Sequence, residues 1–142
     1  MNAPDAVTDS PVPFVAEHIR RFEETAGQPR PGISDLLLTT RGRRSGQLRR
    51  TALAYVADGD AYVLTASNRG ADRHPAWYLN LAADPAVTLQ VGAETFPATA
   101  RRATPAEAER LWPVVVAAMP SYAGYREATA REIPLVLVTR TG

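Results

Sequence analysis

The sequence of 142 residues contains no lysine and no cysteine, and all sixteen of its lysine-plus-arginine residues are arginines. Without lysine, the chain cannot form an enzyme–substrate Schiff base and has no P-loop lysine. Without cysteine, it has no disulfides, no thiolate nucleophile and no cysteine ligands for zinc or iron–sulfur clusters. His18 and His74 are the only imidazoles, so a metal site made of histidines alone is excluded.

Long apolar runs are also missing. The longest, residues 114–119, is far shorter than the roughly 20 residues needed to cross a bilayer. Residues 1–10 are acidic and contain proline, and they lack the basic and apolar regions of a signal peptide. We therefore expect a cytoplasmic protein without an integral membrane segment. Peripheral membrane contact by a helix at residues 13–26 is left open, although its basic and acidic side chains are mixed.

Positive charge is concentrated in one segment, although the net charge is only +1. Residues 41–50 (RGRRSGQLRR) hold five arginines, two glycines and no acidic residue. Guanidinium groups bind phosphate and carboxylate in a bidentate manner, and glycines let backbone N–H groups approach the same anion. The segment therefore predicts an anion-binding turn, with a solvated turn as the alternative. A nucleic-acid interface is disfavoured because it requires a broad basic face.

The rest of the pattern predicts a mainly β (α+β) domain at residues 33–142, preceded by an N-terminal extension at 1–32 with a helix at 13–26. Asp58 and Gly59 predict a type I′ hairpin turn between two strands. Thr104 and Glu107 form a capping box at the start of a helix that ends near residue 118. We expect strands at 35–40, 51–57, 61–66, 87–91, 95–101 and 134–139. Hairpin connections favour an antiparallel barrel with helices packed outside.

Two further segments carry candidate functional side chains. Residues 67–70 form a polar loop that leads, through His74, to a short helix from Pro75 with Trp77 near its start. The helix start offers free N–H donors and Trp77 offers a flat apolar face, although for Trp77 taken alone a place in the core is the favoured interpretation. Tyr122 and Tyr125 share a face if their segment is helical. They either present hydroxyls to a substrate or pack at the rim of the barrel.

Three segments together resemble a known family. Residues 37–49 (LLTTRGRRSGQLR), 66–81 (ASNRGADRHPAWYLNL) and 120–134 (PSYAGYREATAREIP) are similar in order and spacing to the deazaflavin-dependent nitroreductases, the F420H2-dependent reductases of actinobacteria. The similarity covers about residues 33–140. It implies a split antiparallel β-barrel resembling the FMN-binding fold, and the anionic cofactor F420.

The resemblance also implies roles for individual residues. Arg43, Arg44 and Arg49, together with Ser45, would hold the phosphate and the carboxylate tail of F420. The ring system would lie near Thr51 in the middle of a strand. It would also lie near the strand end formed by Ala66, Ser67 and Asn68, and near the helix start that carries Ala76, Trp77 and Asn80. Tyr122 and Tyr125 would lie on the substrate side as candidate catalytic residues. No metal is implied.

The implied reaction is hydride transfer from F420H2 to a quinone-like, nitroaromatic or other conjugated small molecule. Met119 stands where nitroimidazole-reducing relatives have a tyrosine, and a thioether cannot donate a proton, which argues against nitroimidazoles. A non-catalytic F420 or FMN carrier is the alternative. FMN itself is disfavoured as the cofactor because its single phosphate needs fewer cations. A monomer and a homodimer are both compatible with the sequence.

Overall fold

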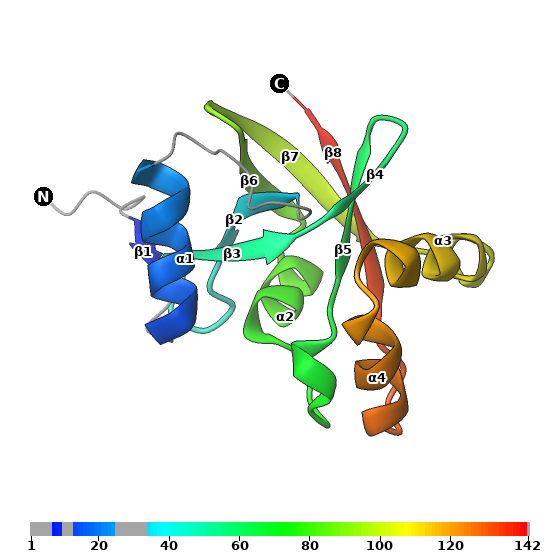
Figure 1. Cartoon of the computed structure of the whole chain (residues 1–142). Helices are drawn as coiled ribbons and strands as arrows, with labels where there is room; N and C mark the ends of the chain where they lie inside the picture. The colour runs from blue at the N-terminus through cyan, green and yellow to red at the C-terminus, as the bar shows by residue number, and fades with distance from the viewer. Residues whose placement is uncertain (1–6, 10–12, 25–33, 142) are drawn as a thin grey trace, which may run out of the picture.

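The structure, a computed structural model, describes residues 7–9, 13–24 and 34–141. These residues form eight strands, four α-helices and one short 3-10 turn (Figure 1). The strands are β1 Val7–Asp9, β2 Asp35–Arg41, β3 Leu48–Ala54, β4 Val56–Asp58, β5 Ala61–Thr65, β6 Ala86–Val91, β7 Glu94–Arg102 and β8 Leu135–Arg140. The helices are α1 Pro13–Glu24, α2 Ala76–Ala83, α3 Pro105–Ala118 and α4 Ser121–Ala128, and the 3-10 turn is η1 Asn68–Gly70.

All eight strands belong to one mixed sheet with the order β1-β3-β2-β6-β7-β8-β5-β4. Every pairing is antiparallel except that of β1, which runs parallel to β3. This edge strand was not predicted, because its three residues lie in the acidic, proline-containing start of the chain. Among the described residues, hydrogen bonds do not close the sheet into a barrel. The expectation of a mainly β domain with helices is confirmed, whereas the barrel itself stays a prediction.

Strand β3, second from one edge of this order, and β4, at the other edge, are nevertheless adjacent in the chain. Only Tyr55 separates β3 from β4, and its N–H donates to the carbonyl of Ser34 at 2.9 Å instead of joining either ladder. A single extended segment therefore pairs with β2 through its first half and with β5 through its second half. Figure 1 shows this segment running from the α1 side of the molecule to the β4–β5 hairpin.

The β4–β5 hairpin exists, but its turn differs from the predicted one. Asp58 is paired with Ala61 at the end of the ladder, so the two loop residues are Gly59 and Asp60. Gly59 has φ +57°, and neither aspartate has a positive φ. A type I′ turn needs a positive φ at both central positions, so the type I′ prediction was wrong. Glycine at the first central position is typical of a type II′ turn.

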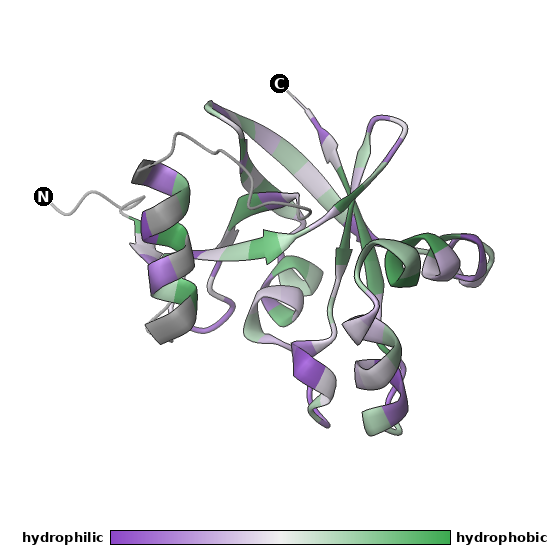
Figure 2. Ribbon diagram, in the orientation of Figure 1, coloured by the Kyte–Doolittle hydropathy of each residue, from purple (hydrophilic) through white to green (hydrophobic). Residues whose placement is uncertain are grey.

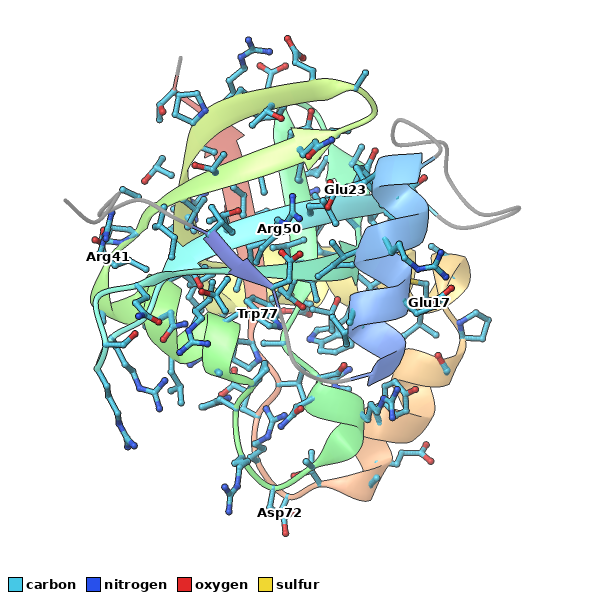
Figure 3. All side chains as sticks on the ribbon, turned by 90° about the vertical axis from the view of Figure 1, so that its left-hand side faces the viewer. Glu17, Glu23, Arg41, Arg50, Asp72 and Trp77 are labelled. Atoms are coloured by element: carbon cyan, nitrogen blue, oxygen red, sulfur yellow. The ribbon has the colours of Figure 1, made fainter. Side chains whose placement is uncertain are left out.

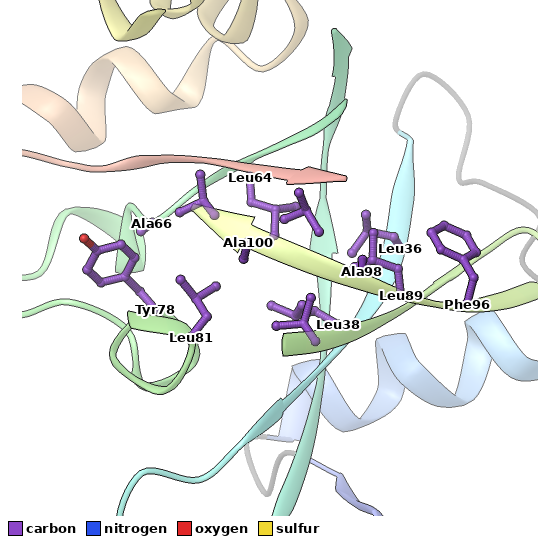
Figure 4. Close-up of a cluster of buried hydrophobic side chains, with 13 residues drawn as sticks. Leu36, Leu38, Leu64, Ala66, Tyr78, Leu81, Leu89, Phe96, Ala98 and Ala100 are labelled. Atoms are coloured by element: carbon purple, nitrogen blue, oxygen red, sulfur yellow. The ribbon is translucent and has the colours of Figure 1, made fainter. Parts of the chain in front are cut away.

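The main core lies between the inner face of the sheet and α2. It contains leucine, valine, alanine and phenylalanine side chains from β2, β5, β6, β7 and β8, together with Tyr78 and Leu81 from α2 (Figure 4). Leu38, Leu64 and Leu89 are fully buried, and replacing any one of them with alanine would cost about 2–5 kcal/mol of stability. Figure 2 shows hydrophilic residues along the β2–β3 loop and η1, outside this core.

Helices cover two parts of the outer face. Helix α1 packs Ile19 and Phe22 against Leu37 and Ala52 of β2 and β3. Helix α3 packs against outward-facing side chains of β5 and β8, which explains why β8 is buried on both faces from Leu135 to Val138, as its apolar sequence predicts. No described helix has both the length and the apolar character needed to cross a membrane.

The capping box that begins α3 is confirmed. The N–H of Glu107 donates to the hydroxyl of Thr104 at 3.2 Å, and the N–H of Thr104 donates to the carboxylate of Glu107 at 2.9 Å. Arg101 also donates to that carboxylate, at 2.7 and 2.8 Å. The hydrogen bonds from Arg101, followed by that from the Thr104 backbone, lower the pKa of Glu107 to about 2. Local sequence therefore fixes the beginning of this helix correctly.

Candidate functional site

The arginine-rich segment is a loop followed by a strand. Residues 42–47 form the loop, which is closed by hydrogen bonds from the N–H of Gly42 to the Gln47 carbonyl at 2.7 Å and from the N–H of Gly46 to the Gly42 carbonyl at 2.8 Å. Gly46 has φ +72°, a conformation that glycine adopts without strain. A Cβ on Gly42 would lie 2.7 Å from Ser45 Oγ, so no larger residue fits there without movement. The loop places Ser45 and the stem of Arg49 beside Gly42.

Arg49 and Arg50 lie on β3 and point to opposite faces, because side chains alternate along a strand. Arg49 shares its face with Thr51 and with Thr40 of β2, on the α2 side of the sheet. Arg50 faces outward, donates from Nε and Nη2 to the two carboxylate oxygens of Asp9 at 2.6 and 3.0 Å, and also pairs with Glu23 (Figure 3). The hydrogen bond to Asp9 is the largest cause of the raised pKa of Arg50.

The prediction of one turn over residues 41–50 is therefore corrected. Hydrogen bonding extends β3 back to Leu48, which removes Arg50 from the anion-binding group and assigns it to holding β1 and α1 against β3. Arg41 donates to the carbonyl of Gly46 at 2.7 Å and helps to close the loop. The arginines that remain available for a ligand are those at 43, 44 and 49.

Asn80 joins the loop to helix α2. Its side chain is 4% exposed, and its Oδ1 accepts from the backbone N–H of Arg43 at 3.1 Å and from the Arg43 guanidinium at 3.3 Å. Its Nδ2 donates to Thr40 Oγ1 at 3.2 Å. Both the oxygen and the nitrogen of the amide thus bind the protein, although one of the two Nδ2 hydrogens has no partner among the described residues. Asn80 orients Arg43 and the loop, a role that sequence alone did not suggest.

The remaining arginines of the loop region have no acidic partner. Arg44 and Arg49 are exposed, and neither guanidinium has an ion-pair or hydrogen-bond partner among the described residues. Elsewhere in the described chain, six arginines form ion pairs with carboxylates: Arg20, Arg50, Arg101, Arg102, Arg110 and Arg140. Unpaired guanidiniums gathered on the loop and the adjoining start of β3 attract an anionic ligand.

The second predicted group lies between β5 and α2. Ala66 and Ser67 are buried at the end of β5, whereas Asn68 is exposed and donates to the Arg73 carbonyl at 3.0 Å. Ala76 is exposed at the first turn of α2. Trp77 is half-buried, packs against the main core and lies on the same helix as the loop-binding Asn80 (Figure 3). Helix α2 therefore links this group to the arginine loop.

The two candidate catalytic tyrosines form a pair on α4. Their ring centroids are 5.7 Å apart, with planes inclined at 39°. Both rings are half-buried against the second apolar cluster, which includes Trp112 and Val115 of α3, so the packing interpretation describes their ring contacts. Helix α4 also lies directly against η1: a Cβ on Gly70 would be 3.0 Å from the Tyr125 carbonyl oxygen. The tyrosines are thus carried next to the second predicted group.

Arg131 is an important residue that the sequence interpretation missed. It follows α4 and donates hydrogen bonds to the loop that connects β5 to α2, including the carbonyls of Ala66 and Ser67 at 3.2 and 2.7 Å. It also contacts His74 Nδ1 at 3.2 Å. Burial, followed by the nearby charges of Arg131 and Arg102, lowers the pKa of His74. No local signal distinguishes Arg131 from the other arginines, because its partners are about 60 residues away in the chain.

Two surface cavities lie outside these groups. One, of about 240 Å³, is on the outer face of the sheet and is lined mainly by Thr39, Arg50, Thr88, Gln90 and Thr95. The other, of about 180 Å³, lies between α2 and the end of β7. Neither contains a predicted site residue. Within the described residues, no three acidic or histidine side chains are placed to hold a metal ion.

Comparison with known proteins identifies the family to which this architecture belongs. A model of the F420H(2)-dependent quinone reductases matches residues 13–140. An F420H(2)-dependent quinone reductase of Mycobacterium tuberculosis is 43% identical over 108 residues, which cover 74% of this chain and 72% of that protein.

Two solved structures are also similar. One, described as an F420-H2 dependent reductase, has a TM-score of 0.68 and 39% identity, and the match covers 74% of this chain and 93% of that one. Another, described as a domain-swapped dimer, has a TM-score of 0.71 and 36% identity over 91% of this chain and 99% of that one. The chain therefore belongs to the F420H2-dependent quinone reductase family, and it is an F420-dependent reductase whose cofactor is F420.

Proposed function

We propose that this protein transfers a hydride from F420H2 to a quinone. The observation that carries the proposal is the group formed by Arg43, Arg44 and Arg49. These three side chains are exposed, have no acidic partners and lie beside α2, in a chain that belongs to this family. The names of the similar proteins support the quinone as acceptor. Met119 argues against nitroimidazoles as acceptors, because a thioether cannot donate a proton, and other nitroaromatic compounds stay the alternative acceptors.

The residues present fit the cofactor. F420 carries a phosphate and several carboxylates, and guanidinium groups are suited to both kinds of anion. In this proposal Arg43, Arg44 and Arg49 bind the tail, with Ser45 beside them on the same loop. Asn80 fixes Arg43 through its carbonyl oxygen and keeps one N–H of its amide for the cofactor.

The ring system is proposed to lie along the α2 side of β3 and the end of β5. Thr51 lies on the same face of β3 as Arg49, so this strand would contact the F420 tail through Arg49 and the F420 ring through Thr51. Ala66, Ser67 and Asn68 would contribute short side chains and backbone groups, and Ala76 and Trp77 would cover the ring from α2. Small residues at these positions leave room for a flat ligand, whereas Trp77 provides an apolar surface.

The chemistry of the reaction comes from the cofactor, which supplies a hydride when bound in its reduced form. The protein binds the tail, orients the ring and excludes water from the reacting face. We propose that the Tyr122 hydroxyl donates a hydrogen bond to the acceptor oxygen as negative charge develops there. Tyr125 packs against the Tyr122 ring and holds it in place.

The fold and assembly belong to the same proposal. Because Tyr55 joins β3, second from one edge of the strand order, to β4 at the other edge, we propose that the sheet curves into a split antiparallel barrel around the main core. The solved relative described as a domain-swapped dimer supports a homodimer. Light scattering on the purified protein, with the mass compared with 15.3 kDa, tests this assembly.

Titration with F420 and with FMN, followed by cofactor fluorescence, tests the assignment of the site. Arg44→Ala and Arg49→Ala are each expected to weaken F420 binding by about tenfold or more, since a lost charge-assisted hydrogen bond is worth about 1.5–3 kcal/mol. Arg110→Ala is the matched control, because this exposed arginine pairs with Asp58 at the β4–β5 turn. Unchanged affinity in the two loop variants, or binding of FMN alone, would contradict the proposed site.

Turnover with a soluble quinone tests the reaction. The wild-type protein should oxidise F420H2 in the presence of the quinone, whereas a carrier would bind F420H2 without oxidising it. Tyr122→Phe should lower kcat and leave F420 affinity unchanged, because only the hydroxyl is removed. Tyr125→Phe is the control, with kcat close to that of the wild type. Full activity of the Tyr122 variant would remove that residue from the mechanism.

A further inference from the structure

The loop from Ala66 to His74 contains an unusual backbone turn. Asn68, Arg69 and Gly70 follow one another with φ values of +45°, +57° and +80°, so three successive residues are left-handed. L-residues with a side chain adopt this conformation only at a cost in free energy, and two of the three carry one. Such a turn persists only where its surroundings hold it in place.

The guanidinium of Arg131 supplies much of that restraint. A guanidinium has five N–H donors in a fixed plane. The structure gives this one five acceptors, four of which belong to the loop: the carbonyls of Ala71 (2.8 Å), Ala66 (3.2 Å) and Ser67 (2.7 Å), His74 Nδ1 (3.2 Å), and the carbonyl of Glu132 (3.4 Å). One side chain thus binds residues on both sides of the left-handed turn.

The chemistry of these contacts requires arginine. The acceptors lie on different sides of a planar group, and the single nitrogen of a lysine could not reach all of them. Because Nδ1 of His74 faces an N–H donor, its proton must reside on Nε2, and the ring is neutral. Burial is the largest cause of the lowered pKa of Arg131, which remains protonated and is stabilised by carbonyl dipoles.

Helix α4 holds the same turn from a second direction. A Cβ on Gly70 would lie 3.0 Å from both Ala128 Cβ and the Tyr125 carbonyl oxygen, so only glycine allows the helix to approach this closely. Thr129, at the end of α4, donates from its hydroxyl to Asp72 at 3.3 Å. The segment that carries the tyrosines and the segment that carries Ala66 and Ser67 are therefore fastened to each other, and Figure 1 shows α4 beside η1.

We propose that Arg131 is a positioning residue that sets the shape of the F420 ring site. It holds residues 66–74 in the left-handed turn, and it thereby fixes the end of β5 relative to α4. This inference rests on the proposed function, because it assigns the ring of F420 to the end of β5. Arg131 does not bind the cofactor itself, since all of its donors are used within the protein.

Two substitutions separate this role from that of a simple charge. Arg131→Lys keeps the charge and loses the planar fork, whereas Arg131→Gln removes the charge and keeps two donors. Both should raise the Kd for F420 by about tenfold or more, with the lysine variant no better than the glutamine variant. Arg126→Lys is the matched control on α4, because this exposed arginine lies over the Trp112 ring, 4.5 Å from its centroid, and makes no hydrogen bond to the loop among the described residues.

Hydrogen exchange without cofactor provides an independent measurement. In the turn, the N–H of Gly70 donates to the Ser67 carbonyl at 2.9 Å, and the N–H of Ala71 donates to that of Asn68 at 3.0 Å. Both amides should exchange faster in the two Arg131 variants and at the wild-type rate in the Arg126 control. Exchange in the β6 and β7 ladder should stay unchanged, which shows that the variants are folded.

The possible results differ for the two proposals. Faster loop exchange together with weaker F420 binding supports the positioning role. Wild-type affinity for F420 in the Arg131 variants would overturn that role and leave the cofactor site in place, as would rescue by lysine alone. A wild-type protein that fails to bind F420 would instead overturn the proposed site, whatever the exchange rates of the loop.

Discussion

Asn80→Ala is the substitution that most directly tests how the arginine loop is held. The amide of Asn80 is buried between α2 and the sheet, and it makes three hydrogen bonds to Thr40 and Arg43. Alanine removes all three and leaves the hydroxyl of Thr40, itself 1% exposed, without that donor. The backbone N–H of Arg43 also loses its acceptor. The loop should then separate from α2.

The size of the effect follows from these contacts. The bonds to the Arg43 N–H and to Thr40 Oγ1 are each worth about 0.5–1.5 kcal/mol, and the exposed guanidinium of Arg43 regains water at little cost. We expect the free energy of unfolding to fall by about 2–3 kcal/mol once the small cavity is included. For a chain of this size, that corresponds to a decrease in Tm of about 5–10 °C.

Urea unfolding followed by circular dichroism gives the first measurement. A double-mutant cycle with Thr40→Val isolates one of the bonds, and its coupling energy should be about 1 kcal/mol. F420 affinity should decrease as well, because Arg43 is no longer oriented. A loss below about 0.5 kcal/mol for Asn80→Ala, or zero coupling to Thr40, would show that the amide does not anchor the loop.

Three other predictions concern the described contacts. Thr104→Ala should lower the free energy of unfolding by about 1 kcal/mol in urea, because the helix cap is lost, whereas Thr104→Ser should retain it. Gly124→Ala and Gly70→Ala form a matched pair for thermal unfolding. Gly124→Ala should raise Tm, because Gly124 lies in a helix and a Cβ there meets no atom within 4 Å. Gly70→Ala should lower Tm, because Gly70 has φ +80° and a Cβ there would make close contacts. His74 has a lowered pKa in the folded state, so the unfolded chain binds more protons below the ordinary value of 6.5. Stability should therefore decrease as the pH falls through that value, and a pH series on His74→Gln should lack this component; an unchanged profile would refute the assignment.

Features that depend on neighbouring residues could be predicted from the sequence. The capping box at Thr104 and Glu107 involves residues three apart, and the helix begins where it predicts. The β4–β5 hairpin was also predicted, but its turn was displaced by one residue. Aspartate is common in turns, yet Asp58 belongs to strand β4. Its pairing with Ala61 adds one more cross-strand contact to the hairpin. Tertiary pairing overrode the local preference.

The candidate site was predicted less completely, because its organisation depends on distant contacts. The five arginines could be recognised as a group, but a strand alternates its side chains, and this places Arg49 on the α2 side and Arg50 against α1. Asn80 could be recognised as a candidate, but its partners are 37 and 40 residues away and show that it binds the protein itself. Arg131 is separated from its loop partners by still more residues of the chain, and no local sequence pattern distinguishes it.

The strand order has a consequence for synthesis of the chain. Strand β8 lies between β7 and β5, so the two parts β1-β3-β2-β6-β7 and β5-β4 share no ladder until residues 135–140 have left the ribosome. Until then, β5 and β7 each present an unpaired edge, the kind of surface on which nascent chains associate wrongly. The covalent joint at Tyr55 exists from the start and keeps the two parts close together. A nascent chain of this protein therefore depends on β8 to join the two parts of the sheet.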